Sequence, residues 1–489
     1  MFLLRNALAY AVITEVWTVR KGPQFRLLFF CFFVVCALPA TAEDTPSQKL
    51  DRQFQSAVAQ YNAGQFAEAA AQLEKLLPQA PQSFEIHELL GLVYAAESDD
   101  SKALQHLEMA VRLKPDSAAA RTNLAANLSR AGKFELAAKQ LQKALALEPR
   151  NFDANHNFGE LYIQSGKIAD AIPFLEKAQQ IDPSSYDNGY DLAQAYSLTG
   201  RLSQARQLIQ TLVRQKDTGE LHSLLGQVEE KDGKFLAAAN EYQLAAHLDP
   251  SEDNLFDWGG ELLIHRTYDP AIEVFRQATL RYPNSPRLRI GLGMALYSRG
   301  NYEESIKSLL AAADLDPADP RCYLFLSKSY LSSPNQADEV IQRFRRYSEL
   351  KPDIALAQYY YAVSLWKGRR LEQSGVDFQT VESLLQKSIA LDGTLADAHL
   401  QLGILYADQH ELAKSLPEYQ RALELNPKSP DAHYRLGQYY VRAGQKDRAQ
   451  QEFAVYQQLQ AQHMAAVDKE RAEVQQFVYS EKPGSVSKP

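Results

Sequence analysis

A period of about 34 residues runs through this chain of 489 residues and restricts its fold more than any other feature. Small residues recur every 33 to 35 positions, apart from one gap of 41: Ala57, Gly91, Ala125, Gly159, Ala193, Gly226, Gly259, Gly293, Ser327, Ala362, Gly403 and Gly437. A second small residue follows most of them twelve positions later, and a proline follows many of them at twenty-four. A period of this length is typical of proteins built from stacked repeats.

The stretch from Asp153 to Pro183 shows what one repeat contains. Apolar residues at i, i+3, i+4 and i+7 predict two amphipathic helices. Gly166 suits the tight turn between them, and Pro183 ends the second helix. Gly159 and Ala171 are both small, so we expect the two helices to cross there with their backbones close together. Because one helix pair cannot bury its apolar face alone, the pairs are predicted to stack into an all-α superhelical solenoid.

The repeats resemble those of the tetratricopeptide repeat family, whose pattern is L-G-x-x-Y…A-x-x-x-F…P. The matching stretches are Leu90-Gly91-Val93-Tyr94…Ala103…Leu107…Pro115, Leu402-Gly403-Tyr406…Tyr419…Pro427 and Leu436-Gly437-Tyr440…Ala449…Phe453. The resemblance covers residues 50–463 and implies about twelve helix pairs. Since this family consists mostly of binding scaffolds, it implies protein or peptide partners and does not imply a particular reaction.

Departures from the period suggest how the chain is divided. We predict an N-terminal array of about nine repeats over residues 50–353 and further repeats over 354–463, with an insert at 367–377. The insert is either a joint between two subarrays or a tolerated surface loop. A largely polar helix over 464–479 is expected to cap the open end of the solenoid. Residues 480–489 are expected to form a short disordered tail.

The N-terminal segment has the layout of an export signal. A basic stretch over residues 20–26 precedes the apolar run 27–38, and Ala40-Thr41-Ala42 follows it. This order predicts a signal peptide over residues 1–42, cleaved after Ala42. The apolar run is short for a spanning helix, which needs roughly 20 residues. The prediction is therefore a periplasmic or secreted protein, with an uncleaved membrane anchor as the alternative.

Charge and motifs exclude several classes of function. Lys and Arg number 52 against 60 Asp and Glu, and this net charge of -8 argues against a nucleic-acid partner. No metalloprotease, P-loop or nucleophile-elbow motif is present, so we expect no enzyme and no cofactor. Four histidines share one repeat position and are therefore held apart, which predicts no metal site: His87, His222, His399 and His433. Cys322 is expected to be a small buried residue.

Two columns of side chains suggest where a partner binds. In this family, positions six and three residues before the small residue face the concave surface. The first position is acidic in eight repeats: Asp51, Glu85, Asp153, Asp187, Glu220, Asp253, Asp397 and Asp431. These acids either favour the helix dipole and cap free N–H groups or form an acidic groove. The second position carries Phe54, His156, Tyr190, Phe256, Tyr359 and Tyr434, which either pack between helices or bind a partner.

We predict the partner-binding residues where both columns are filled in the same repeat. The predicted set is Asp153 with His156, Asp187 with Tyr190, and Asp253 with Phe256, together with Asn123 and Asn157 beside the first pair. The function that follows is a non-enzymatic exported scaffold, serving envelope assembly or polysaccharide export. The alternative is a membrane-anchored subunit of an inner-membrane complex.

Overall fold

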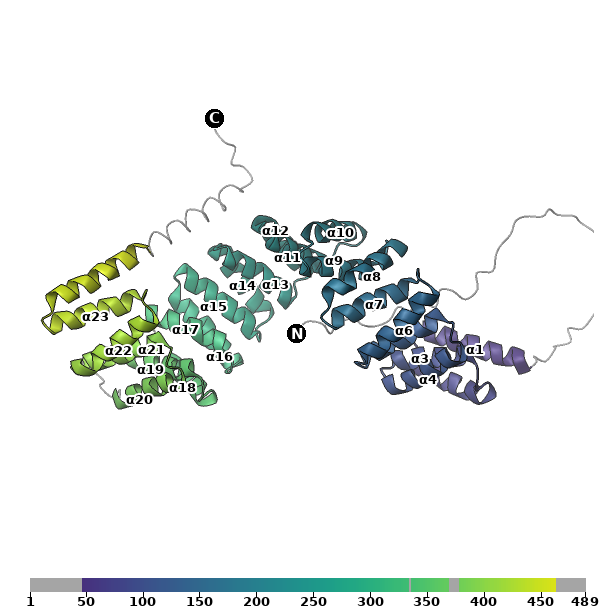
Figure 1. The fold of residues 1–489 in the computed structure, drawn as a ribbon, viewed down its shortest axis with the longest axis horizontal. Helices are drawn as coiled ribbons and strands as arrows, with labels where there is room; N and C mark the ends of the chain where they lie inside the picture. Colours follow the sequence, from purple (N-terminus) through teal and green to yellow (C-terminus); the bar gives the residue numbers. More distant parts are fainter. Residues whose placement is uncertain (1–45, 334–335, 369–377, 463–489) are drawn as a thin grey trace, which may run out of the picture. The chain divides into compact units, whose positions relative to one another are not determined.

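The computed structural model describes residues 46–333, 336–368 and 378–462, and every regular element in these ranges is a helix (Figure 1). The predicted all-α solenoid of consecutive helix pairs is confirmed. The predicted signal peptide at 1–42, capping helix at 464–479 and tail at 480–489 lie outside the described residues. Helix α19 runs through Lys367 and Gly368, the first two residues of the predicted insert, and residues 369–377 lie outside the described ranges.

The chain divides into two compact units, and unit 1 has described residues 46–217. Unit 1 contains five helix pairs and a short 3-10 helix, η1 (Leu77–Gln79). The pairs are α1 (Pro46–Asn62) and α2 (Phe66–Leu76), α3 (Phe84–Ala96) and α4 (Asp100–Leu113), α5 (Ala118–Arg130) and α6 (Phe134–Leu147), α7 (Phe152–Gln164) and α8 (Ile168–Ile181), and α9 (Tyr186–Leu198) and α10 (Leu202–Gln215).

Unit 2 begins at Thr218 and continues the same pattern. Its complete pairs are α11 (Gly219–Lys231) and α12 (Phe235–Leu248), α13 (Glu252–Ile264) and α14 (Tyr268–Arg281), α15 (Pro286–Arg299) and α16 (Tyr302–Leu315), α17 (Pro320–Ser332) and α18 (Ala337–Leu350), α19 (Ala355–Gly368) and α20 (Phe378–Leu391), and α21 (Ala396–Asp408) and α22 (Leu412–Leu425). The last described pair is α23 (Pro430–Arg442) with a helical segment over 446–462.

The packed core of unit 2 runs through residues 353 and 354, where the sequence suggested a boundary between two groups of repeats. That grouping stays a prediction. In unit 2, one cluster of buried side chains extends from Ile290 through Phe344 and Tyr360 to Tyr406, so the core is continuous across that point. The chain passes from one compact unit to the other between Asp217 and Thr218. The irregular turn and the insert interrupt the sequence period, but the apolar faces of the flanking helices still pack together.

Short polar residues start the first helix of each pair in unit 1 from α3 onward. Ser83, Ser117, Asn151 and Ser185 precede α3, α5, α7 and α9, and each accepts a hydrogen bond from the backbone N–H three residues later. Such caps satisfy N–H groups that have no partner inside the helix. These four residues therefore define where each first helix begins.

Two glycines in the α7–α8 pair have separate roles. A Cβ on Gly159 would overlap the side chain of Leu175 in α8, so the glycine makes room for a buried leucine. Gly159 is therefore small because the side chain of Leu175 occupies the space beside it. The sequence instead predicts a close approach of the two helix backbones at this point. Gly166, between the helices, has a φ of +73°, in the left-handed region that other residues rarely adopt.

First helices of successive repeats contact one another within each unit. In unit 1 these contacts join α1, α3, α5, α7 and α9 in order. We call the surface formed by these helices the first-helix face of unit 1. Side chains that are remote in the sequence, about 34 residues apart, thereby become neighbours across adjacent helices.

Candidate functional site

Asp153 and Asp187 lie in the first turns of α7 and α9, and both residues are exposed. The capping hydrogen bond of α7 comes from Asn151, whose side chain accepts the N–H of Ala154 at 2.9 Å. Ser185 caps α9 in the same way. Capping therefore does not explain the two acids, although the helix dipole still favours a carboxylate at both positions.

The carboxyl group of Asp153 is not fully hydrated although the residue is exposed. Desolvation at the helix surface raises the pKa of Asp153, and the neighbouring His156 partly offsets this effect. Asp153 and His156 are three residues apart on α7, so their side chains share one face of the helix. The two residues that the sequence paired in this repeat therefore do lie together.

His156 connects two adjacent first helices. Its Nδ1 lies 3.2 Å from Oδ1 of Asn188 in α9, and its Nε2 lies 3.8 Å from Oε1 of Glu160, one turn further along α7. The imidazole ring also stacks on Phe152, with the ring centroids 5.8 Å apart. The half-buried ring is thus held by contacts on both sides, and its position is defined.

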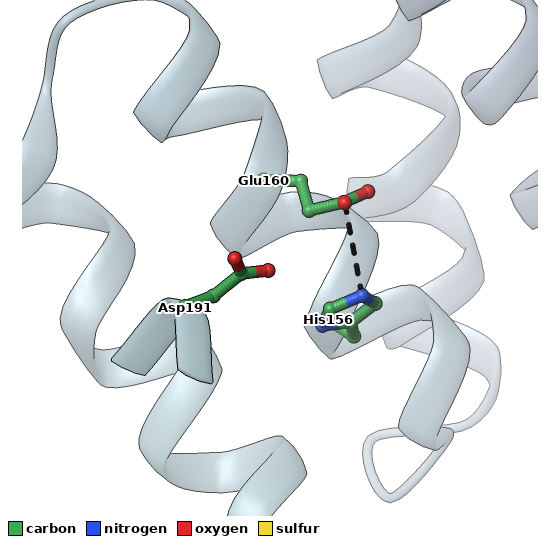
Figure 2. Close-up of side chains that lie close together, drawn as sticks. All are labelled: His156, Glu160 and Asp191. Atoms are coloured by element: carbon green, nitrogen blue, oxygen red, sulfur yellow. Dashed lines mark ion pairs between the residues drawn. The ribbon is translucent and has the colours of Figure 1, made fainter. Parts of the chain in front are cut away.

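Two carboxylates beside His156 were not predicted from the sequence. Figure 2 shows Glu160 of α7 and Asp191 of α9 gathered around His156, and the potential ligand atoms of the three residues all lie within 4.8 Å of one another. Glu160 directly follows the small residue Gly159, a position that the two sequence columns did not include. Asp191 is two residues before Ala193, the position that Asn123 and Asn157 occupy in the preceding repeats, and following this column would have found it.

Asn123 and Asn157 occupy the same repeat position, but their surroundings differ. Nδ2 of Asn123 donates a hydrogen bond to Oε1 of Glu88 at 3.3 Å, which links α5 to α3. Burial raises the pKa of Glu88, and the bond from Asn123 partly offsets this rise. Asn157 is half-buried, and its side chain makes no hydrogen bond to any residue that the structure describes. Its amide group is therefore available to a bound partner.

The predicted residues of unit 1 lie on three successive first helices. Asn123 is on α5, Asp153, His156 and Asn157 are on α7, and Asp187 and Tyr190 are on α9. Tyr190 is half-buried. Because α5 contacts α7 and α7 contacts α9, these residues form one patch on the first-helix face of unit 1.

Asp253 and Phe256 belong to unit 2 and contact an arginine of the next repeat. Arg287, on α15, pairs with Asp253 at 2.6 Å, and its guanidinium carbon lies 3.7 Å from the centroid of the Phe256 ring. Phe256 also contacts the buried Phe275 edge to face, at 5.9 Å between centroids. Lateral packing, the alternative considered for the aromatic column, therefore describes Phe256. Arg287 neutralises part of the charge of Asp253, and sequence reasoning did not include it.

The histidine column joins the two helices of individual repeats. Nδ1 of His399 lies 2.6 Å from Oε2 of Glu418, and Nδ1 of His433 lies 2.6 Å from Oε2 of Glu452. In both cases the partner is 19 residues further along the chain, on the second helix of the same pair. His87 instead faces His106, at 3.0 Å between the Nδ1 atoms. These contacts agree with the interpretation of the column as a repeat position.

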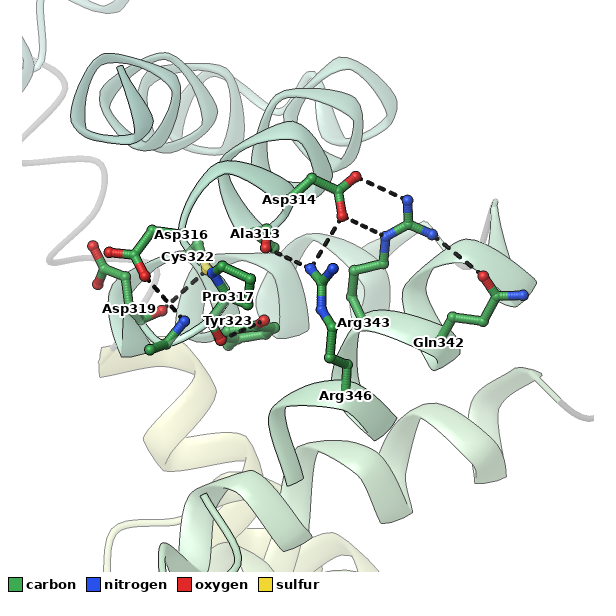
Figure 3. Close-up of polar contacts among 11 residues, drawn as sticks. Ala313, Asp314, Asp316, Pro317, Asp319, Cys322, Tyr323, Gln342, Arg343 and Arg346 are labelled. Carbon is green, nitrogen blue, oxygen red and sulfur yellow. Dashed lines mark hydrogen bonds and ion pairs between the residues drawn. The ribbon is translucent and has the colours of Figure 1, made fainter. Parts of the chain in front are cut away.

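A polar network around Asp314 in unit 2 fastens helices together (Figure 3). Arg343 and Arg346 of α18 pair with Asp314 of α16 at 2.9 and 3.0 Å.

Nearby, the buried Cys322 donates its S–H to the backbone carbonyl of Asp319 at 3.1 Å. Burial raises the pKa of the Cys322 thiol to about 12, and the charge of Asp319 adds to the effect. A thiol that stays protonated is a poor nucleophile, so this cluster has a structural role.

Stacked pairs of helices with a period of about 34 residues place the chain in the class of helical repeat proteins. Models described as tetratricopeptide repeat match residues 54–118, 122–186, 162–228, 257–320, 396–429 and 418–451. The chain belongs to the tetratricopeptide repeat family. Repeats of this family typically mediate interactions between proteins, and the fold is generally non-catalytic.

Curated relatives match parts of the chain. The mouse (Mus musculus) protein named Protein O-mannosyl-transferase TMTC3 is 23% identical over 36% of this chain and 20% of its own length. The Peroxisomal targeting signal receptor of Eremothecium gossypii is 33% identical over 16% of this chain and 14% of its own length. The TPR repeat-containing protein YpiA of Bacillus subtilis is 23% identical over 38% of this chain and 42% of its own length. The chain thus spans less than half the length of each of these relatives.

Solved structures of similar fold include the APC/C hetero-tetramer Cut9-Hcn1, at 14% identity and a TM-score of 0.37, covering 87% of this chain and 96% of the other. A tetratricopeptide repeat protein from Parabacteroides merdae aligns at 16% identity with a TM-score of 0.38, over 51% of this chain and 99% of its own.

Across the described residues, no helix combines the length and the apolar character needed to cross a bilayer.

Proposed function

We propose that this chain is a non-enzymatic scaffold that binds protein or peptide partners on the first-helix face of unit 1. The observation that carries the proposal is the patch formed by α5, α7 and α9. It presents the half-buried Asn157 amide, which has no hydrogen-bond partner among the described residues, on the same face as His156 of α7 and Tyr190 of α9. A patch that combines polar groups with aromatic rings suits an extended peptide, because it offers both hydrogen bonds and stacking.

The charges on this patch favour a basic partner segment. Asp153, Glu160 and Asp187 contribute three carboxylates from α7 and α9. A segment with lysine or arginine side chains would be attracted to them, whereas an acidic segment would be repelled. In unit 2, Arg287 already pairs with Asp253. Asp153 and Asp187, which hold the same repeat position in unit 1, have no ion pair with any described residue. Unit 1 is therefore the better site for a basic peptide.

Capture of partners by the full chain tests the proposal. Variants Asn157→Ala and Tyr190→Ala, combined in one protein, remove an available amide and a half-buried ring from the patch. The matched control is Lys177→Ala. Lys177 is an exposed residue of α8, the second helix of the α7–α8 pair. Loss of an aromatic anchor at an interface costs about 2 kcal/mol, or roughly a 30-fold loss of affinity.

The double variant should release its partners while the control retains them, as measured by quantitative mass spectrometry of purified complexes. Helix content, measured by circular dichroism, should be equal in both variants. If the folded double variant captures the same partners at the same level, the contact surface lies elsewhere on the chain.

The site of action that we propose is outside the cytosol, in a bacterial periplasm or the exterior. The support is the order of basic, apolar and small residues over 20–42. Envelope assembly and polysaccharide export are the processes that this placement favours. N-terminal sequencing of the mature protein, followed by fractionation after a carbonate wash, tests the proposal. A chain that begins at Glu43 in the soluble fraction supports export, and an intact N-terminus in the membrane fraction supports the anchored subunit.

A further inference from the structure

We propose that His156, Glu160 and Asp191 form a binding site for a divalent transition metal ion such as Zn²⁺ on the first-helix face of unit 1. Among the residues that the structure describes, they are the one group of three or more His, Cys, Asp or Glu side chains with ligand atoms all within 4.8 Å of one another. The sequence predicted no metal site because the four histidines that share one repeat position are held apart. This group was missed because Asp191 comes close to His156 only when α9 packs on α7.

Spacing in the chain already places two of the ligands together. His156 and Glu160 are four residues apart on α7, so they project from the same face of the helix. Nε2 of His156 lies 3.8 Å from Oε1 of Glu160. Nitrogen and oxygen ligands bind zinc at about 2.0–2.2 Å, which sets neighbouring ligand atoms roughly 3–3.5 Å apart. A small side-chain rotation would therefore bring this pair to metal-binding distance.

Asn188 determines which nitrogen of His156 faces the carboxylates. Nδ2 of Asn188 donates to the backbone carbonyl of Leu175 at 3.1 Å and to Oε1 of Gln179 at 2.8 Å. A backbone carbonyl can only accept, so Nδ2 is the atom on that side of the amide and Oδ1 is the atom facing His156. The amide is fully buried, at 0% exposure, and is held in this orientation.

The orientation of the amide makes Nδ1 of His156 the donor, because Oδ1 of Asn188 lies 3.2 Å away and can only accept. In a neutral imidazole, Nε2 then carries a lone pair, and this lone pair is on the side of Glu160. Histidines that bind metals usually donate their other ring N–H to a neighbouring acceptor in this way. The lone pair of Nε2 and the carboxylate of Glu160 thus face one another, and a divalent cation placed between them would bind to both.

The ligand set indicates the class of metal. An imidazole favours Zn²⁺, Co²⁺ or Ni²⁺ over Mg²⁺ and Ca²⁺, which prefer oxygen ligands alone. Three protein ligands leave at least one coordination position open. On the proposed function, the imidazole of a histidine in a bound peptide would fill that position. Metal binding by the chain alone does not depend on that function and can be tested separately.

The experiment is a titration of the EDTA-treated full chain with Zn²⁺ by calorimetry and with Co²⁺ by visible absorption. The test variants are Glu160→Gln and Asp191→Asn, which keep the size of each side chain. The matched control is Glu452→Gln, because Glu452 pairs with His433 at 2.6 Å but has no third ligand within reach among the described residues. Mg²⁺ serves as a competitor.

We expect one site per chain that is weakened at least tenfold by Glu160→Gln or Asp191→Asn and is unchanged by Glu452→Gln. The visible absorption of bound Co²⁺ should disappear when Glu160→Gln and Asp191→Asn are combined in one protein. An excess of Mg²⁺ should not displace Co²⁺. Failure of the full chain to take up either ion would overturn the proposal. Uptake that is equal in the wild type and in both test variants would also overturn it.

Discussion

Asn188 of α9 accepts the ring N–H of His156 of α7 and so fixes the orientation of the histidine across two helix pairs. The same buried amide donates to Leu175 and Gln179 on α8. One side chain therefore connects three helices and also orients the polar centre of the candidate site. Stability and site geometry are coupled at this residue.

Replacement of Asn188 by alanine should destabilise unit 1 by about 2 kcal/mol, because it removes three hydrogen bonds of a buried amide and leaves the ring N–H of His156 without its acceptor. The effect should appear as faster hydrogen exchange of α8 and α9. Asn157→Ala is the control, since its side chain has no hydrogen-bond partner among the described residues, and it should change stability by less than about 0.5 kcal/mol. Equal exchange rates in both variants would contradict the assigned hydrogen bonds.

The turns between paired helices offer a test of backbone strain. Gly166 has a φ of +73°, and no heavy atom lies within 4 Å of the point that an alanine Cβ would occupy. Gly166→Ala should therefore destabilise the chain by about 1 kcal/mol through backbone strain alone. Ser98 occupies the equivalent turn between α3 and α4 with a φ of 63°. Ser98→Gly should stabilise that pair by about 0.5 kcal/mol. Urea unfolding monitored by circular dichroism would show opposite shifts of the midpoint, and shifts of the same sign would contradict this account.

Glu261 on α13 should make unit 2 less stable as the pH rises. Burial raises the pKa of its carboxyl group to about 7, and the nearby Glu230 adds to the effect. Nε2 of His265 lies 3.3 Å from Oε1 of Glu261, but burial lowers the pKa of His265, so that ring compensates only weakly. The folded chain therefore binds a proton more tightly than the unfolded chain, and the stability that this proton provides is lost between about pH 4.5 and pH 7.

Glu261→Gln should consequently stabilise unit 2 by about 2 kcal/mol at pH 8 and much less at pH 5. Glu273→Gln, a change of an exposed carboxylate on α14, should show no such dependence on pH. The measurement is the urea midpoint of each variant at both pH values. A gain for Glu261→Gln that is the same at pH 5 and pH 8 would rule out a raised pKa as its cause.

Cys322 should not react with thiol reagents while unit 2 is folded. Burial raises the pKa of its thiol to about 12, and the side chain is fully enclosed at 0% exposure. Alkylation with iodoacetamide at pH 8, mapped by mass spectrometry, should label Cys322 only after addition of urea. Rapid labelling of this residue in the native chain would show that α17 opens readily.

The helix pairs could be predicted because each repeat carries its own local signals. Gly159 leaves room for Leu175 and Gly166 adopts a left-handed turn, and both features recur with the same period. Contacts between repeats were harder to predict. Arg287 reaches Asp253 from 34 residues away, and its type at that position is not part of the repeat pattern.

The candidate site shows the same limit. His156 was found because its column was followed along the chain, and Glu160 could have been found from its spacing on the same helix. Asp191 approaches them only through the packing of α9 on α7. A column analysis that included the positions two before and one after the small residue would have identified all three.

The most direct test of the binding surface is site-specific photocrosslinking in living cells that express the full chain. A photoreactive residue at position 157 lies on the first-helix face of unit 1, and one at position 177 lies on the exposed side of α8 in the same repeat. The account predicts discrete adducts with a protein partner from position 157, absent from position 177 and lost when Tyr190→Ala is added. Adducts of equal yield from both positions, or from position 177 alone, would contradict the claim that this face binds the partner.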